Sequence, residues 1–190
     1  MLLRSEATFE LARRVQIGDA TLGEVFAFCS GLYFRGKLAY GRHFARPPEA
    51  TSGAQVITPS RGLLPWDSPV DPACLREFAS IQVDVSEPRY VEPLAASAAA
   101  LARLDLDEIV LLGSIATGKY VECLLPHFGE RLRFPRDFVG RGDMSRGALL
   151  LRCVAENEEL SYAPVLGAIR RGSRPGKLTP LRQNSKTVET

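Results

Sequence analysis

The strongest chemical signal in the sequence is a glycine-rich turn at residues 113–119, which follows an apolar run and precedes a helix-like pattern. Its residues fit G-x-x-x-x-G-K, in which backbone N–H groups and a lysine hold a phosphate group. The residues expected to form this cradle are Gly113, Ser114, Thr117, Gly118 and Lys119. A nucleotide-hydrolysing loop needs Ser or Thr for Mg²⁺ at the next position, where this chain has Tyr120. The pattern therefore favours either anion binding without hydrolysis or a structural strand-to-helix turn.

A second candidate site is the loop at residues 58–67, which follows a short strand-like run and contains two prolines. Arg61 has the forked geometry that binds phosphate or carboxylate, and Trp66 offers a face on which a base can stack. Asp67 is a candidate polar reader or general base. The alternative is a rigid loop in which Trp66 anchors packing and Arg61 pairs with Asp67.

A third candidate is the segment at residues 138–147, which contains arginines beside a predicted helix start. Asp143 or Ser145 is expected to cap that helix. Arg141 and Arg146 are expected to point toward the same edge as Lys119 and to act as charge partners for a bound anion.

Residues 30–37 mix polar, aromatic and glycine residues within a helix-like pattern. Two interpretations stay open: the segment lines the wall of a pocket, or it is a core helix with an exposed basic edge. His43 and His127 have no ligand-like neighbours at metal-binding spacing, so we expect no metal at either. The four cysteines lack a C-x-x-C pair and are expected to be reduced core thiols. The common hydrolase motifs are absent from the sequence.

The elements that must position these residues alternate between helices and strands, which predicts an α/β fold. We expect one domain over residues 1–169: a three-layer sandwich with a mostly parallel central sheet and helices on both faces. The apolar run at 109–112 is expected to be a central strand buried on both sides. The expected helices are 21–44, which is one helix or a kinked pair capped by Thr21, then 71–81, capped by Asp71, 90–104, 120–128 and 144–156. The expected strands are 55–58, 109–112, 131–134 and 160–165.

Composition limits the class of protein. The 190 residues are 45% hydrophobic and 24% charged with a formal net charge of +2, as in a globular domain with a substantial core. Residues 168–190 hold six Lys or Arg against one Glu, so we expect a flexible basic tail over residues 170–190. Its partner would be an acidic protein or a nucleic acid. The sequence contains no apolar run of membrane-spanning length, which favours a soluble, cytoplasmic protein without a membrane partner.

Three segments carry a family resemblance: residues 32–39, residues 56–67 and residues 111–114. Together they resemble a family of uncharacterised bacterial α/β proteins, which is distantly similar to the uracil-DNA-glycosylase-like fold. The likeness covers roughly residues 25–125. It implies a three-layer sandwich and the handling of nucleotides or nucleic acid, with Ser60, Arg61, Gly62 and Asp67 at the matching loop.

Three functions remain open on these grounds. The first is binding of a phosphorylated ligand, a nucleotide or a nucleic acid, at the C-terminal edge of the sheet. There the 113–119 turn would hold phosphate, Arg61 and Arg141 would add charge, and Trp66 would stack. The second is a protein–protein interaction module that lacks a small-molecule site. The third is an enzyme acting on a base or nucleoside, for which Asp67 and Asp143 are the candidate carboxylates. The sequence names no cofactor.

Overall fold

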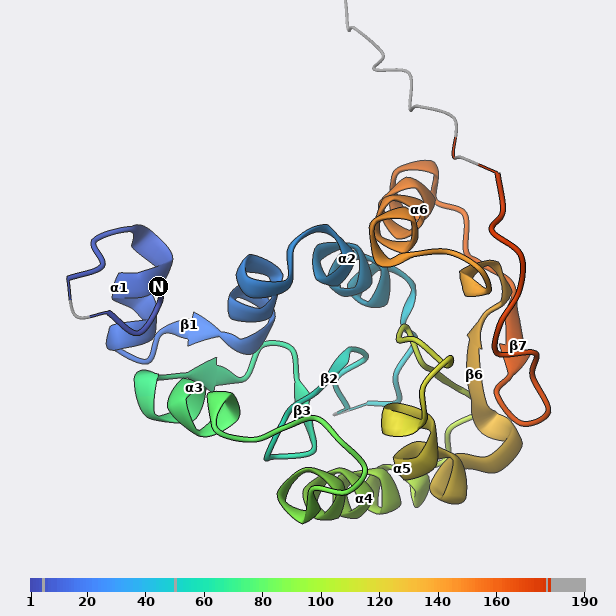
Figure 1. The fold of residues 1–190 in the computed structure, drawn as a ribbon, viewed down its shortest axis with the longest axis horizontal. Helices are drawn as coiled ribbons and strands as arrows, with labels where there is room; N and C mark the ends of the chain where they lie inside the picture. Colours follow the sequence, from blue (N-terminus) through green and yellow to red (C-terminus); the bar gives the residue numbers. More distant parts are fainter. Residues whose placement is uncertain (5, 50, 177, 179–190) are drawn as a thin grey trace, which may run out of the picture.

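The computed structural model describes residues 1–4, 6–49, 51–176 and 178 (Figure 1). Its α-helices are α1 (Glu10–Gln16), α2 (Leu22–Phe44), α3 (Pro72–Ala79), α4 (Pro88–Ala102), α5 (Gly118–Phe128) and α6 (Asp143–Glu156), with 3₁₀ turns at Gly129–Arg131 and Arg136–Phe138. Its strands are β1 (Ala20–Thr21), β2 (Gln55–Ile57), β3 (Leu63–Pro65), β4 (Pro69–Val70), β5 (Ile109–Val110), β6 (Leu132–Pro135) and β7 (Tyr162–Pro164). The predicted helices and strands are each found, with ends shifted by a few residues.

The expected three-layer sandwich with a mostly parallel central sheet is wrong. Within the described residues, the strands form two antiparallel pairs, β1–β4 and β2–β3, and one three-stranded sheet of order β5–β6–β7. In that sheet β5 is parallel to β6, and β7 is antiparallel to β6. The structure is therefore mainly helical with small separate sheets, and the helices pack largely on one another (Figure 1).

Local hydrogen bonding explains why β2 stays out of the larger sheet. Gly62 has a φ of 63°, which turns the chain back at once so that β3 pairs with β2. Thr58 closes the turn, since its N–H and its hydroxyl both donate to the Gly62 carbonyl at 2.8 and 2.9 Å. The apolar run at 109–112 contributes only Ile109 and Val110 to β5, which lies at the sheet edge and is half-buried.

The buried side chains form three clusters. The sheet cluster joins β5 and β6 to α4 and α5, and includes Tyr90, Leu94, Leu124 and Leu132. The N-terminal cluster joins α1, the start of α2 and α3, and includes Val15, Leu22, Val25 and Phe78. The α2–α6 cluster includes Tyr40, Phe138, Leu149, Leu150 and Cys153.

Helix α2 begins as predicted and is broken once. Thr21 caps it through a capping box, in which its hydroxyl accepts from the Glu24 N–H and the Glu24 carboxylate accepts from the Thr21 N–H. Gly31 interrupts the helix with φ 64° and ψ −144°. The part after this break crosses α6 at Gly36 and Gly147, where a Cβ built on Gly36 would lie 2.7 Å from the Gly147 carbonyl oxygen. The two glycines let the helix backbones touch.

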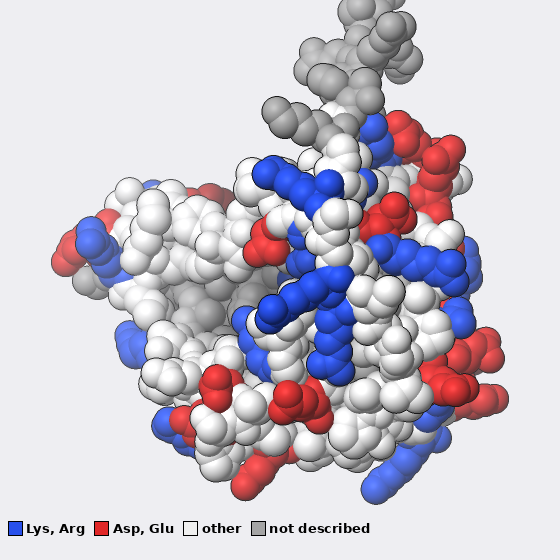
Figure 2. Space-filling model, turned by 45° about the vertical axis from the view of Figure 1, so that its right-hand side comes forward, with Lys and Arg blue, Asp and Glu red and all other residues white. Residues whose placement is uncertain are grey.

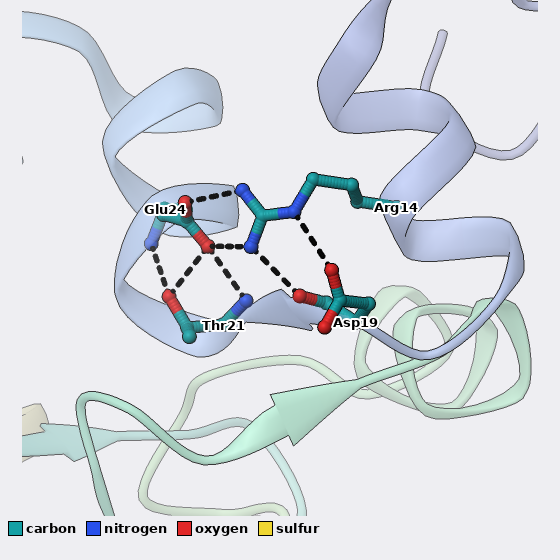
Figure 3. A network of polar contacts seen from close by, with 4 residues as sticks. All are labelled: Arg14, Asp19, Thr21 and Glu24. Atoms are coloured by element: carbon teal, nitrogen blue, oxygen red, sulfur yellow. Dashed lines mark hydrogen bonds and ion pairs between the residues drawn. The ribbon is translucent and has the colours of Figure 1, made fainter.

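A polar network ties α1 to the start of α2 (Figure 3). The Arg14 guanidinium donates to both carboxylate oxygens of Glu24, at 2.6 and 2.9 Å, and to the side chain and carbonyl of Asp19. These bonds and the capping box hold the pKa of Glu24 at about 2. The network fixes the angle at which the chain leaves α1 and enters α2.

The described part of the C-terminal segment packs on the body. A Cβ at Gly140 would collide with the Ser173 carbonyl, and Leu178 packs against the α2–α6 cluster. Arg170, Arg171 and Arg174 are exposed. In Figure 2 basic side chains gather in a column below the end of the described chain. The other predicted tail cations, Lys177, Arg182 and Lys186, lie outside the described residues.

Among the described residues, the structure contains no helix that is long and apolar enough to cross a membrane.

Candidate functional site

The 113–119 turn lies where the sequence places it, between β5 and α5. Its backbone does not have the alternating right- and left-handed conformation of a phosphate nest, since neither Gly113 nor Gly118 has a positive φ. Ser114 Oγ accepts from the Ala116 N–H at 3.3 Å, which orders the turn internally. The Glu122 carboxylate lies against the Cα of Gly118. The turn therefore does not have the conformation of a backbone phosphate cradle, and any anion affinity must come mainly from side chains and helix ends.

A pocket of about 280 Å³ lies where this turn meets helices α2 and α6. In Figure 1 the yellow segment before α5 rises toward α2 and α6. The lining residues come from α2, the turn, α5 and α6, and they are Ser30, Tyr33, Phe34, Lys37, Gly113, Ser114, Lys119, Tyr120, Asp143 and Met144. We call this the α2–α5–α6 pocket. It unites three sequence segments that are separated by more than 20 residues each.

Helix starts surround the pocket because β5 and β6 are parallel. Their C-terminal ends meet at one edge, and α5 and α6 each begin after one of these ends. The residues before these helices, Thr117 and Gly142, form no side-chain cap. The expected capping of α6 by Asp143 or Ser145 is therefore wrong. The first turns of both helices direct backbone N–H groups and a partial positive charge toward this edge.

Two lysines line the pocket. Lys37 Nζ lies 4.5 Å from the centre of the Tyr33 ring and 5.2 Å from that of Phe34, one turn earlier on α2. Lys119 Nζ lies 5.0 Å from the centre of the Tyr120 ring at the start of α5. Burial, opposed by the Asp143 carboxylate and aided by the positive charges of Lys119 and Arg146, lowers the pKa of Lys37 to about 8. The pocket thus contains two lysine amines, each lying over an aromatic ring.

Hydrogen bonds from the half-buried Tyr33 and the buried Tyr90 hold the walls in place. The Tyr33 hydroxyl donates to the Leu112 carbonyl at 3.0 Å, which joins α2 to the segment after β5. The Tyr90 hydroxyl donates to the Lys119 carbonyl at 2.8 Å, which fixes the first turn of α5 from α4. Burial raises the pKa of Tyr33 to about 12, so its hydroxyl stays a donor at neutral pH.

Arg141 and Arg146, which were expected at this edge, hydrogen-bond to the segment before α6. Arg146 is buried, and its Nε and Nη2 both donate to the Phe138 carbonyl, at 3.2 and 3.0 Å. Arg141 donates to the Asp137 carbonyl at 2.9 Å and to Ser145 Oγ at 3.3 Å. Neither arginine lines the pocket. The hydrogen bonds of both stabilise the segment before α6.

The 58–67 loop does not join the pocket. Arg61 makes a two-pronged ion pair with Glu77 of α3, at 2.6 and 3.2 Å, and not with Asp67. Trp66 packs on the N-terminal cluster, as the structural alternative predicts, and its ring is covered by Arg42 at 4.1 Å. Asp67 is exposed and lies outside the pocket lining. Of the two candidate carboxylates, only Asp143 lies at the pocket.

Ser30, Tyr33, Phe34 and Lys37 line the pocket. Tyr33 and Phe34 also pack against the core clusters and Arg35 is exposed, so the segment combines features of both interpretations. The signal in the sequence is a lysine placed three and four residues after aromatic residues and six residues after the glycine that breaks the helix. The 113–119 pattern contributes Gly113, Ser114 and Lys119 to the lining, whereas Thr117 and Gly118 stand beside it.

Metal and thiol chemistry receive no support in the described part of the chain. Its His, Cys, Asp and Glu side chains form no group of three that could hold a metal ion. Cys74, Cys123 and Cys153 are buried free thiols, as expected, whereas Cys29 is exposed.

Comparisons with protein-family models, with curated proteins and with solved structures gave no match. The function is therefore argued from the pocket alone.

Proposed function

We propose that this protein binds a small phosphorylated compound in the α2–α5–α6 pocket. The observation that carries the proposal is the pair Lys37 and Lys119, which come from different helices and line one cavity with a single carboxylate, Asp143, among its lining residues. Two ammonium groups beside the starts of α5 and α6 favour an anion over a cation or a neutral ligand.

The size and walls of the pocket support a particular class of ligand. A volume of about 280 Å³ lies just below the usual range for small-molecule sites, about 300–1,000 Å³. A nucleoside monophosphate or sugar phosphate suits this size better than a dinucleotide. Tyr33 and Tyr120 offer ring surfaces for a base or sugar, while Ser30 and Ser114 offer hydroxyls for hydrogen bonds.

A second hollow makes a poorer site for an anion. It measures about 420 Å³ and lies at the opposite, N-terminal ends of β5 and β6, where it is lined by acidic and basic residues together. Its cations are engaged, since Arg133 pairs with Glu108 at 3.2 Å and Arg131 donates to the carbonyls of Leu106 and Ala102. The charges there largely cancel.

The test is calorimetric titration and thermal melting with AMP, ribose 5-phosphate and glucose 6-phosphate, with adenosine and ribose as unphosphorylated controls. A compound that binds only the folded state raises Tm. Lys119→Gln removes a charge-assisted contact worth about 1.5–3 kcal/mol, so Kd should rise about tenfold or more. Arg61→Gln is the matched control, because Arg61 pairs with Glu77 outside the pocket and its loss should leave Kd unchanged.

Two results would overturn the proposal. One is a folded wild-type protein whose Tm none of the phosphorylated compounds changes. The other is binding that Lys119→Gln and Lys37→Met both leave intact. A short oligonucleotide belongs in the same panel, because binding by the basic C-terminal segment would fall steeply with salt and survive both lysine variants.

A further inference from the structure

We propose that Lys37 forms an imine with the carbonyl group of a phosphorylated aldehyde or ketone bound in the α2–α5–α6 pocket. This inference rests on the proposed phosphate site and adds a chemical step to it. It assigns different roles to the two lysines: Lys119 holds the phosphate group and Lys37 is the nucleophile.

The geometry supports this division. Lys119 stands in the first turn of α5, where the helix dipole adds to its own charge in holding an anion. Lys37 lies in the interior of α2, with Nζ held over the Tyr33 and Phe34 rings. The Tyr33 ring is fixed by its hydrogen bond to the Leu112 carbonyl. The amine therefore lies against two aromatic rings in the wall of the pocket.

The protonation state of Lys37 supports nucleophilic attack. A lysine removed from water beside a second cation is an activated amine. With a pKa of about 8, roughly a quarter of Lys37 side chains are neutral at pH 7.5, against about one in a thousand for a lysine of pKa 10.5. Lys37 therefore presents far more neutral amine at pH 7.5 than a lysine of ordinary pKa does.

The step balances without a further reactant. The neutral Lys37 nitrogen attacks the carbonyl carbon to give a carbinolamine. That intermediate loses the former carbonyl oxygen as water, which takes up the two hydrogens released by the nitrogen, and a C=N bond remains. Asp143 and the Tyr120 hydroxyl line the same pocket and are the groups placed to pass these protons.

The experiment uses three matched probes on the full chain at pH 7.5. Glyceraldehyde 3-phosphate carries both features, glycerol 3-phosphate lacks the carbonyl group, and glyceraldehyde lacks the phosphate group. Each is incubated with cyanoborohydride, which reduces an imine to a stable secondary amine, and the modified residue is located by mass spectrometry. In parallel, calorimetry measures the binding of glycerol 3-phosphate.

The expected result is one adduct, on Lys37, at least tenfold faster with glyceraldehyde 3-phosphate than with glyceraldehyde. Lys119→Gln should remove that tenfold advantage, and Lys37→Arg should abolish the adduct, whereas the control Arg61→Gln should change neither. Binding of glycerol 3-phosphate without a Lys37 adduct overturns the imine and leaves the phosphate site standing. Adducts spread over Lys119 and other lysines also overturn it. No binding of glycerol 3-phosphate and no adduct in a folded protein overturns the imine, and the phosphate site falls with it when AMP, ribose 5-phosphate and glucose 6-phosphate also fail to bind.

Discussion

The close approach of α2 and α6 predicts that one added methyl group at Gly36 destabilises the protein. A Cβ there would lie 2.7 Å from the carbonyl oxygen and 3.0 Å from the Cα of Gly147. Both atoms belong to the backbone of α6, so they cannot rotate away as a side chain would. Restoring an ordinary contact requires the two helices to separate by about 0.7 Å, in a region that is otherwise close-packed.

The magnitude follows from two opposing effects. Overpacking of this kind costs about 1–3 kcal/mol, and replacing Gly by Ala within a helix returns about 0.5–1 kcal/mol. Taking the middle of each range, we expect Gly36→Ala to lower the free energy of unfolding by about 1.3 kcal/mol, which lowers Tm by about 2.5–5 °C in a chain of this length. Gly147→Ala should act similarly, since its Cβ would lie 2.8 Å from the Leu32 carbonyl oxygen.

The matched control lies on the same helix. A Cβ at Gly41 would lie 3.4 Å from the Ala54 Cβ and 4.0 Å from a Leu112 methyl group, which is ordinary contact. Gly41→Ala should therefore keep the helix-propensity gain and leave Tm unchanged or raise it by up to about 4 °C. Urea unfolding followed by circular dichroism measures all three variants. A Gly36→Ala protein as stable as Gly41→Ala would refute the argument from helix contact.

Two further predictions concern local geometry. Glu24→Gln should lower the free energy of unfolding by about 1 kcal/mol at pH 7, a value discounted because Glu24 and Arg14 are partly exposed. Because the folded-state pKa is lowered from 4.5 to about 2, this stabilisation is full above pH 4.5 and is lost as pH falls toward 2. The difference from wild type in urea should shrink by about half at pH 3, and an unchanged difference would contradict the network. Gly62→Ala should cost about 3 kcal/mol, because φ is +63° and the new Cβ would collide with the Pro93 carbonyl. Gly18→Ala, with φ +73° and open space, isolates the backbone cost at about 1–2 kcal/mol, and equal Tm losses for the two would rule out the collision.

Local signals in the sequence predict local structure well here. Thr21 and Asp71 both cap helices as expected, because a cap needs only a side chain and an N–H three residues away. Strand pairing failed as a prediction because it is decided by distant or competing partners. The 55–58 run pairs with the residues just after its own turn, and the 109–112 run reaches a ladder for two residues only. Alternation of helices and strands therefore did not imply one continuous parallel sheet.

The candidate site shows the same limit. Gly113, Ser114 and Lys119 could be found in the sequence because the G-x-x-x-x-G-K pattern is contiguous. The importance of Lys37 could not be predicted from the sequence, because its environment depends on segments about 80 and 105 residues later in the chain. The expected role of Arg61 at the site was wrong because its guanidinium pairs with the carboxylate of Glu77 on α3.

The break at Gly31 divides α2 between two cores. Before it, Leu22 and Val25 pack in the N-terminal cluster, and after it Tyr40 packs in the α2–α6 cluster. In an unbroken helix, a displacement of the residues that contact α1 and α3 would also displace the residues that line the pocket. With the helix broken, the two halves are joined by side-chain contacts such as that between the Phe26 and Phe34 rings, whose centres lie 5.4 Å apart. We therefore expect the N-terminal cluster to open locally at the cost of such contacts, while the half that bears Lys37 keeps its packing on α6.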